Sequence, residues 1–110
     1  MSAARLFLLQ RASAAVLAVA VLVHLATILL AVRGGLTAGE ILGRTAGNLA
    51  WLAFYLLFVV AAAIHAPIGL RAILREWAGW RGRSCDVAMA LFAALLLLLG
   101  LRAAWAVYAA

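Results

Sequence analysis

The sequence contains no lysine, and acidic residues are nearly as scarce, since only three accompany nine arginines. Cys85 is the single cysteine, which excludes an intrachain disulfide and a cysteine metal cage. Repeats, low-complexity tracts and long linkers are absent, so nothing marks a separate soluble domain. Charged residues make up only 11% of the chain, too few for the surface of a water-soluble domain.

Apolar residues are what the chain has in abundance, at 71% of 110 residues. A bilayer core requires about 20 apolar residues per helix, and three stretches are long enough. They are residues 12–32, 48–72 and 87–108. The sequence therefore predicts an all-α membrane protein with a single three-helix transmembrane domain over residues 1–110. Because the connections at 33–47 and 73–86 are short, water-soluble catalysis must come from partner chains.

The first stretch has some features of a cleaved signal peptide, because Arg5 and Arg11 precede an apolar run. That run is about twice as long as the usual apolar region of a signal peptide. Arg33 also stands where a small residue is needed for cleavage. We therefore expect the first stretch to remain as a membrane helix.

The distribution of arginines predicts the orientation in the membrane, because basic residues accumulate on the cytoplasmic side. Six lie before the first stretch, at the end of the second or after it, namely Arg5, Arg11, Arg71, Arg75, Arg81 and Arg83. The three on the other side are Arg33, Arg44 and Arg102. The N-terminus is therefore expected in the cytoplasm and the C-terminus outside. The net charge of +6 reflects topology and contact with anionic lipid rather than nucleic-acid binding.

His65 lies within the second apolar stretch, where a titratable ring needs a partner or a ligand. At about 100° per residue, one helix face carries Phe54, Phe58, Ala61, His65, Gly69, Ala72 and Glu76. Ala61 and Gly69, one turn to either side of His65, are small enough for a flat group to lie against the backbone. A porphyrin requires this of the helix that supplies its axial ligand. Small residues also serve ordinary helix packing, so both interpretations stay open.

Pro67 and a charged segment follow His65. Pro67 removes the hydrogen bond to the Ala63 carbonyl and is expected to bend the helix. Arg71 and Glu76 lie about 9–17 Å further along the axis, at the cytoplasmic interface. Arginines there also fit ordinary snorkelling. Glu76 shares the face of His65 and is expected to point into the bundle.

His24, in the first stretch, is the other intramembrane histidine. Two histidines that bind one iron must lie at nearly equal depth. At about 1.5 Å per residue, His24 lies about 18 Å and His65 about 9–11 Å from the inner surface. The opposite ligand of an iron at His65 is therefore expected from another chain. His24 is either the ligand of a second, outer haem or a histidine bonded to a neighbouring helix.

Several segments resemble the small hydrophobic subunits of succinate dehydrogenase and fumarate reductase, and the resemblance covers nearly the whole chain. Arg11-Ala12-Ser13 is similar to the start of that family's first helix, and Gly35-Leu36-Thr37 with Glu40 to its first loop. Ile64-His65-Ala66-Pro67-Ile68-Gly69 resembles the segment that carries the haem b ligand in the anchor-protein subunit. Gly69-Leu70-Arg71 is nearer to the His-x-x-x-Gly-x-Arg of the cytochrome b subunit, which leaves the choice between the two subunits open.

The resemblance implies a subunit of a succinate:quinone oxidoreductase that passes electrons from an iron–sulfur subunit to quinone, without catalysis by this chain alone. The activity belongs to electron transport and the tricarboxylic acid cycle. The implied partners are a flavoprotein subunit, an iron–sulfur subunit and a second hydrophobic subunit in a bacterial cytoplasmic (inner) membrane. The implied cofactor is one haem b, which a partner subunit helps to hold.

The resemblance also assigns roles to individual residues. His65 would be the axial ligand, with haem or propionate contacts from Arg11, Gly69 and Ser13. The quinone-site candidates are Arg71, Glu76, Trp77 and Arg11. His24 is the candidate for a second haem.

Two departures from the family pattern bear on the chemistry. The usual His-Arg-x-Ser-Gly appears as Gln-Arg-Ala-Ser-Ala at residues 10–14, and the Asp-Tyr pair of the quinone site appears as Glu76-Trp77. An indole N–H can donate a hydrogen bond to a quinone carbonyl, but it cannot release its proton as a tyrosine does. Proton delivery is then expected from Glu76 or a partner subunit, while Arg71 or Arg11 stabilises a developing quinol oxyanion.

Two other functions are compatible with a chain of this length. A haem-free structural membrane anchor needs only the three helices and would leave His65 without a ligand. A small multidrug or ion transporter normally keeps a carboxylate deep in a span, whereas Glu40, Glu76 and Asp86 all lie at or beyond helix ends. The position of these carboxylates argues against transport.

Overall fold

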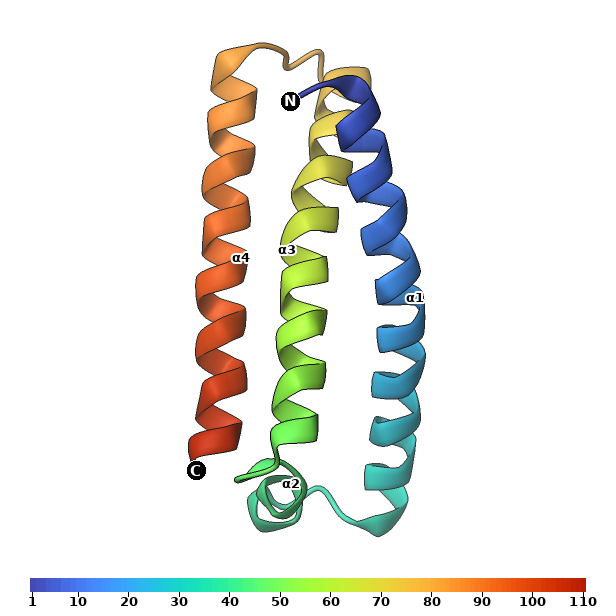
Figure 1. The fold of residues 1–110 in the computed structure, drawn as a ribbon, viewed down its shortest axis with the longest axis vertical. Coiled ribbons are helices and arrows are strands. Elements are labelled where there is room, and N and C mark those ends of the chain that lie inside the picture. The colour runs from blue at the N-terminus through green and yellow to red at the C-terminus, as the bar shows by residue number, and fades with distance from the viewer.

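The fold, a computed structural model that describes residues 1–110, consists of four helices and no strands. They are α1 (Ala3–Gly34), α2 (Ala38–Thr45), α3 (Leu49–Trp77) and α4 (Arg83–Ala109). The three long helices form a bundle 47 Å long, in which α3 lies between α1 and α4 and runs antiparallel to both (Figure 1). The short helix α2 lies at the end of the bundle remote from the N-terminus (Figure 1). α1, α3 and α4 are each long and apolar enough to cross a membrane, so the predicted class and the three spans are confirmed.

All three long helices extend beyond the predicted apolar stretches at one or both ends, and side-chain caps set the starts of α1 and α3. The side chain of Ser2 accepts a hydrogen bond from the Arg5 N–H, so α1 begins at Ala3. The Asn48 side chain accepts from two backbone N–H groups at the start of α3. Apolar length predicts how much helix crosses the bilayer, but caps determine where the helix begins. Pro67 does not interrupt α3, which is helical from Leu49 to Trp77.

Residues 33–47 connect the first two spans, and they include the short helix α2, which was not predicted from the sequence. The Thr37 side chain accepts from the Glu40 N–H and caps α2, which is one of the two bonds of a capping box. At its other end, α2 is attached to α4. The Thr45 hydroxyl donates to the carbonyl of Val107 at 3.0 Å, and the Gly47 N–H donates to that of Tyr108 at 2.9 Å. These bonds satisfy carbonyls at the C-terminal end of α4 that have no partner within the helix.

The interior of the bundle is made almost entirely of small side chains. The buried residues are Ser13, Ala20, Ala31, Thr45, Ala61, Ala63, Pro67, Cys85, Met89 and Ala104. Membrane helices associate through such residues because small side chains let two backbones approach closely. Gly100 of α4 is the tightest example, since a Cβ there would overlap both γ-methyl groups of Val59 on α3.

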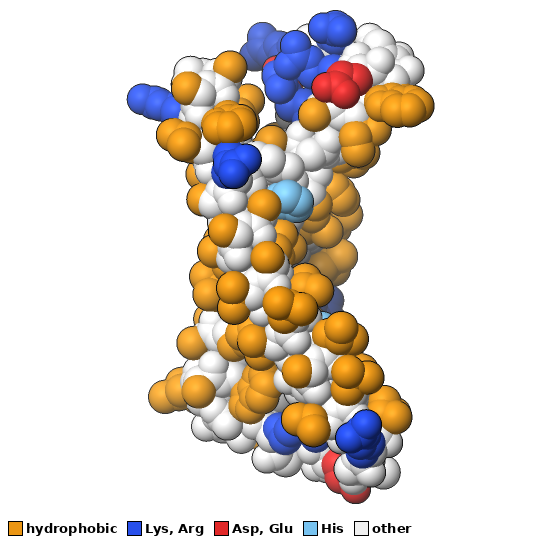
Figure 2. Space-filling model, turned by 90° about the vertical axis from the view of Figure 1, so that its right-hand side faces the viewer, with side chains coloured by type: hydrophobic (Ala, Val, Ile, Leu, Met, Phe, Trp, Pro, Cys, Tyr) orange, Lys and Arg blue, Asp and Glu red, His pale blue; other side chains and the backbone are white.

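The middle of the outer surface is apolar and the charges lie mainly toward the ends. Figure 2 shows arginines and acidic groups gathered at both ends of the visible face, with hydrophobic side chains between them. The exposed hydrophobic residues include many leucines on α1 and α4. A surface of this kind requires lipid or other membrane-embedded chains around it.

Gly100→Ala is expected to destabilise the packing of α3 on α4. Overpacking a close contact costs about 1–3 kcal/mol, and the higher helix propensity of alanine recovers about 1 kcal/mol at most. The thermal unfolding midpoint of the detergent-solubilised protein measures the effect. Val59→Ala combined with Gly100→Ala should restore much of the loss, because it removes the overlapping methyl groups. Gly39→Ala is the control, since a Cβ there meets nothing within 4 Å. An unchanged midpoint for Gly100→Ala would show that the contact is not tight.

Candidate functional site

The face of α3 that carries His65 is covered along much of its length by α1. Contacts occur in antiparallel register, with Ser13 against His65, Gln10 against Gly69, and His24 against Phe58. The helical periodicity therefore identified a real interface. The small residues on this face allow α1 to pack closely on α3. Helix packing is the second of the two interpretations left open by the sequence.

His65 is half-buried, and its two ring nitrogens have different surroundings. Nδ1 lies 3.4 Å from the hydroxyl oxygen of Ser13, a buried residue with 5% of its surface exposed. The Ser13 hydroxyl in turn lies 3.1 Å from the main-chain carbonyl of Gln10, to which it donates. Nε2 makes no hydrogen bond within the chain and is not enclosed. The ring thus has one nitrogen engaged and the other open.

Gln10 is a polar neighbour of this site that sequence reasoning did not select. Its side-chain nitrogen would lie 3.1 Å from a Cβ on Gly69, so the glycine makes room for the carboxamide. The Gln10 Oε1 atom is buried without a hydrogen-bond partner, which is uncommon in folded proteins. The available signal was the spacing, because Gln10 precedes Ser13 by three residues and so shares its helix face.

The surroundings of His65 suit a histidine that ligates a metal through Nε2. They leave limited room for a porphyrin to lie flat against Ala61 and Gly69. An accessible Nε2 with the other nitrogen engaged is the usual arrangement of a ligating histidine. Ala61, however, is only 5% exposed, and the backbone at Gly69 is approached by Gln10. The space beside these two small residues is thus partly filled within the chain, and the expectation that a flat group lies against them stays a prediction. Other metal ligands do not gather here, because no group of three His, Cys, Asp or Glu residues occurs in the chain.

His24 lies among aromatic rings instead of polar partners. Its ring meets Tyr55 and Phe58 edge to face, with centroid distances of 6.2 and 5.6 Å, and its Nδ1 atom is buried without a hydrogen bond. The interpretation of His24 as a histidine bonded to a neighbouring helix is therefore wrong within this chain. His65 lies level with Ser13, eleven residues from His24 along α1, or about 16 Å. The two histidines cannot share one iron within the chain, as predicted.

Arg11 points away from His65. It lies about 160° around α1 from Ser13, is exposed, and its guanidinium carbon lies 5.7 Å from the centroid of the Phe7 ring. The structure therefore brings Ser13 to the histidine but not Arg11. A role for Arg11 would have to involve groups outside this chain.

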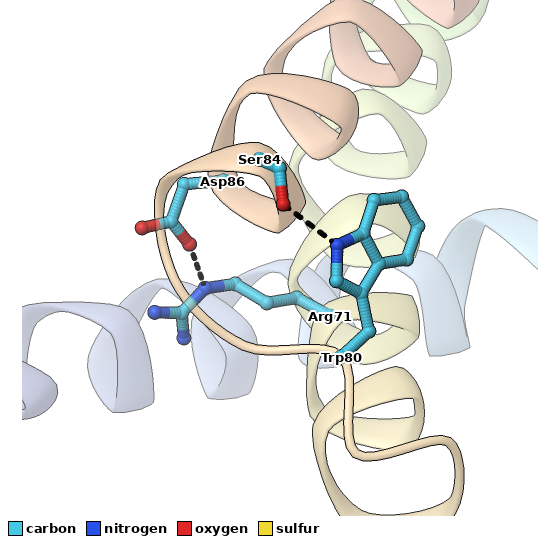
Figure 3. Close-up of polar contacts among 4 residues, drawn as sticks. All are labelled: Arg71, Trp80, Ser84 and Asp86. Atoms are coloured by element: carbon cyan, nitrogen blue, oxygen red, sulfur yellow. Dashed lines mark hydrogen bonds and ion pairs between the residues drawn. The ribbon is translucent and has the colours of Figure 1, made fainter.

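Arg71 is engaged with α4. Its Nε donates to Asp86 at 2.7 Å, and the Trp80 indole N–H donates to the Ser84 hydroxyl at 2.9 Å (Figure 3). Both contacts hold the turn between α3 and α4. Sequence reasoning missed Asp86 as the partner of Arg71, because fifteen residues and a turn separate them.

An apolar groove of about 510 Å³ lies between α1 and α4, with α3 as its floor. Leu6 and Leu9 of α1, Pro67 of α3 and Met89 of α4 contribute to its walls, and the Arg71–Asp86 pair also lines it. Pro67 lies about 200° around α3 from His65. The groove and the histidine therefore occupy different sides of α3.

Glu76 and Trp77 are exposed at the end of α3, and Trp77 is 86% exposed. The expectation that Glu76 points into the bundle is wrong within this chain. It shares the face of His65, but at the end of α3 its side chain is exposed. Both side chains remain available to a partner or a ligand at this end of the molecule.

The Arg71–Asp86 pair is expected to stabilise the turn between α3 and α4 by a small amount, because Asp86 is largely exposed. Arg71→Gln and Asp86→Asn should each lower the thermal midpoint slightly, and the double variant should lie no lower than either single variant. The differences should shrink in high salt. Arg75→Gln is the control, since Arg75 forms no ion pair. Strictly additive effects would contradict the pairing.

Comparison with known proteins supports the resemblance seen in the sequence. A family model described as "Succinate dehydrogenase/Fumarate reductase transmembrane subunit" matches residues 2–105. No curated protein and no solved structure matched the chain. The matched region includes α1, α2, α3 and most of α4. The chain therefore belongs to the family of transmembrane subunits of succinate dehydrogenase and fumarate reductase.

Proposed function

We propose that this chain anchors a succinate:quinone oxidoreductase in a bacterial cytoplasmic membrane and holds haem b through His65. Membership of the family implies that the chain works with other subunits of such a complex in a membrane. The finer assignment rests on one observation, the half-buried imidazole of His65 with Nδ1 beside Ser13 and Nε2 open. An ionisable ring at this depth is costly without a ligand or a partner.

A second hydrophobic subunit is expected to complete the haem site. His24 lies too far along α1 to supply the opposite ligand, and the chain has no other histidine. Since Ser13 of α1 lies at Nδ1 of His65, a ligand is expected to approach the ring at Nε2. When bound, haem b supplies a one-electron carrier with a potential set by its ligands and its burial.

The quinone site is proposed at the end of the bundle that carries the N-terminus, on the cytoplasmic side predicted from the arginines. Of the quinone-site candidates, Glu76, Trp77 and Arg11 are exposed and form no ion pair. Glu76 can pass a proton, the Trp77 N–H can donate to a quinone carbonyl, and Arg11 can stabilise negative charge on the reduced ring. Arg71, paired with Asp86, contributes to the wall of the site instead of acting as a free cation.

The soluble partners are expected to dock on this same end. A flavoprotein subunit would oxidise succinate to fumarate, and an iron–sulfur subunit would pass the electrons to quinone. This chain would provide the membrane floor and part of the quinone pocket, without catalysing the succinate reaction itself.

A haem-free anchor is the second candidate, because one observation favours it. Of the small residues beside His65, Ala61 is already buried within the chain, and Gln10 of α1 lies against Gly69. In that case His65 would serve helix packing alone through its contact with Ser13. A colourless complex that assembles stably would identify this function.

His65→Ala is expected to remove the haem while leaving the complex in the membrane. The experiment uses the chain expressed with its partner subunits, and compares the dithionite-reduced optical spectrum with the amount of assembled complex. The b-type band should be almost completely lost, because no other histidine of this chain is at the same depth. His24→Ala is the matched control and should keep the band. A full band in His65→Ala would disprove the ligand assignment.

A further inference from the structure

We propose that Ser13 is a positioning residue that holds His65 as the Nδ1–H tautomer, so that Nε2 presents its lone pair away from α1. This inference rests on the proposed function, because it concerns the same histidine. It assigns to Ser13 a hydrogen bond to the ring, in place of the contact with haem or a propionate that the family resemblance implies.

The direction of the Ser13 hydroxyl hydrogen determines which tautomer of His65 is favoured. A serine hydroxyl has a single hydrogen and can also accept. The Ser13 hydroxyl lies 3.1 Å from the carbonyl of Gln10 and 3.4 Å from His65 Nδ1. The carbonyl can only accept, so the hydroxyl hydrogen points to Gln10. The lone pair of the same oxygen then faces Nδ1, and an accepting oxygen favours a proton on that nitrogen.

The opposite tautomer would be less favourable at this place. A proton on Nε2 would be a donor without any partner in the chain, on a ring within the apolar part of α3. An unpaired donor in an apolar environment is costly. With the proton on Nδ1, both hydrogens of the cluster have acceptors. The sequence of bonds is then His65 Nδ1–H to Ser13 Oγ, and Ser13 O–H to the Gln10 carbonyl.

The burial of Ser13 protects these two hydrogen bonds from water. Only 5% of its surface is exposed, so water cannot replace the hydroxyl readily. A histidine that ligates a metal generally donates its other N–H to a fixed acceptor, which orients the ring and raises the basicity of the ligating nitrogen. Ser13 supplies such an acceptor from a different helix, so the packing of α1 on α3 determines the orientation of the ligand.

Ser13→Ala in the assembled complex tests the proposal by readouts other than activity. Loss of the acceptor should weaken haem retention about 10-fold or more. It should also shift the haem midpoint potential to more positive values, because a less basic Nε2 stabilises ferric iron less. Nitrogen NMR of the histidine-labelled full chain without haem should report a proton on Nδ1 of His65 in the parent. Ser13→Thr retains the hydroxyl and should return the potential toward that of the parent.

Thr27→Val is the matched control, because Thr27 also donates to a carbonyl of α1, that of Val23 at 2.8 Å, and makes no hydrogen bond to a histidine. Its potential should remain that of the parent. An equal shift in Thr27→Val would assign the effect to a loosened α1 and overturn the proposal. An unchanged potential in Ser13→Ala, a potential in Ser13→Thr equal to that of Ser13→Ala, or a proton on Nε2 in the parent would also overturn it. These results differ from failure of the proposed function, in which His65→Ala itself keeps the haem.

Discussion

Close approach of the long helices through small side chains is the constraint on which the structure depends. Nine of the ten buried residues are no larger than threonine or proline, and the exception is Met89. Inside a bilayer, water is not driven out when helices meet, so association relies on contact between surfaces that fit closely. Gly100 against Val59 and Ser13 against His65 are two results of this closeness. The large apolar side chains are left on the outside for lipid and for other subunits.

The central place of α3 follows from this packing and divides its surface between two tasks. One side meets α1 and holds His65 next to Ser13, while another forms the floor of the groove between α1 and α4. Arg71 and Asp86, which are paired near one end of the bundle, join α3 to α4 beside the turn between them. Polar groups that remain exposed, among them Glu76 and Trp77, project from the end of α3. A chain organised in this way can fix one ligand precisely while leaving its terminal groups to partners.

Much of the fold could be predicted from the sequence, because apolar length and helical periodicity are local properties. They gave the three spans and the face that carries His65. They could not tell what covers that face, since periodicity is the same whether a porphyrin or α1 lies against it. The pairing of Arg71 with Asp86 depends on the geometry of a turn. α2 was not predicted, although Thr37 and Glu40 have the spacing of a helix cap. An eight-residue amphipathic helix contains no long apolar run, so hydropathy does not reveal it.

The bonds from Thr45 and Gly47 to the last carbonyls of α4 have a consequence for the order of assembly. The ribosome makes α2 before α4, so the acceptors for these two donors do not yet exist when α1, α2 and α3 have been synthesised. These two bonds from the connection between the first two spans can therefore form only after the last span has been made. Entry of α4 thus supplies the acceptors for two donors in a segment made earlier.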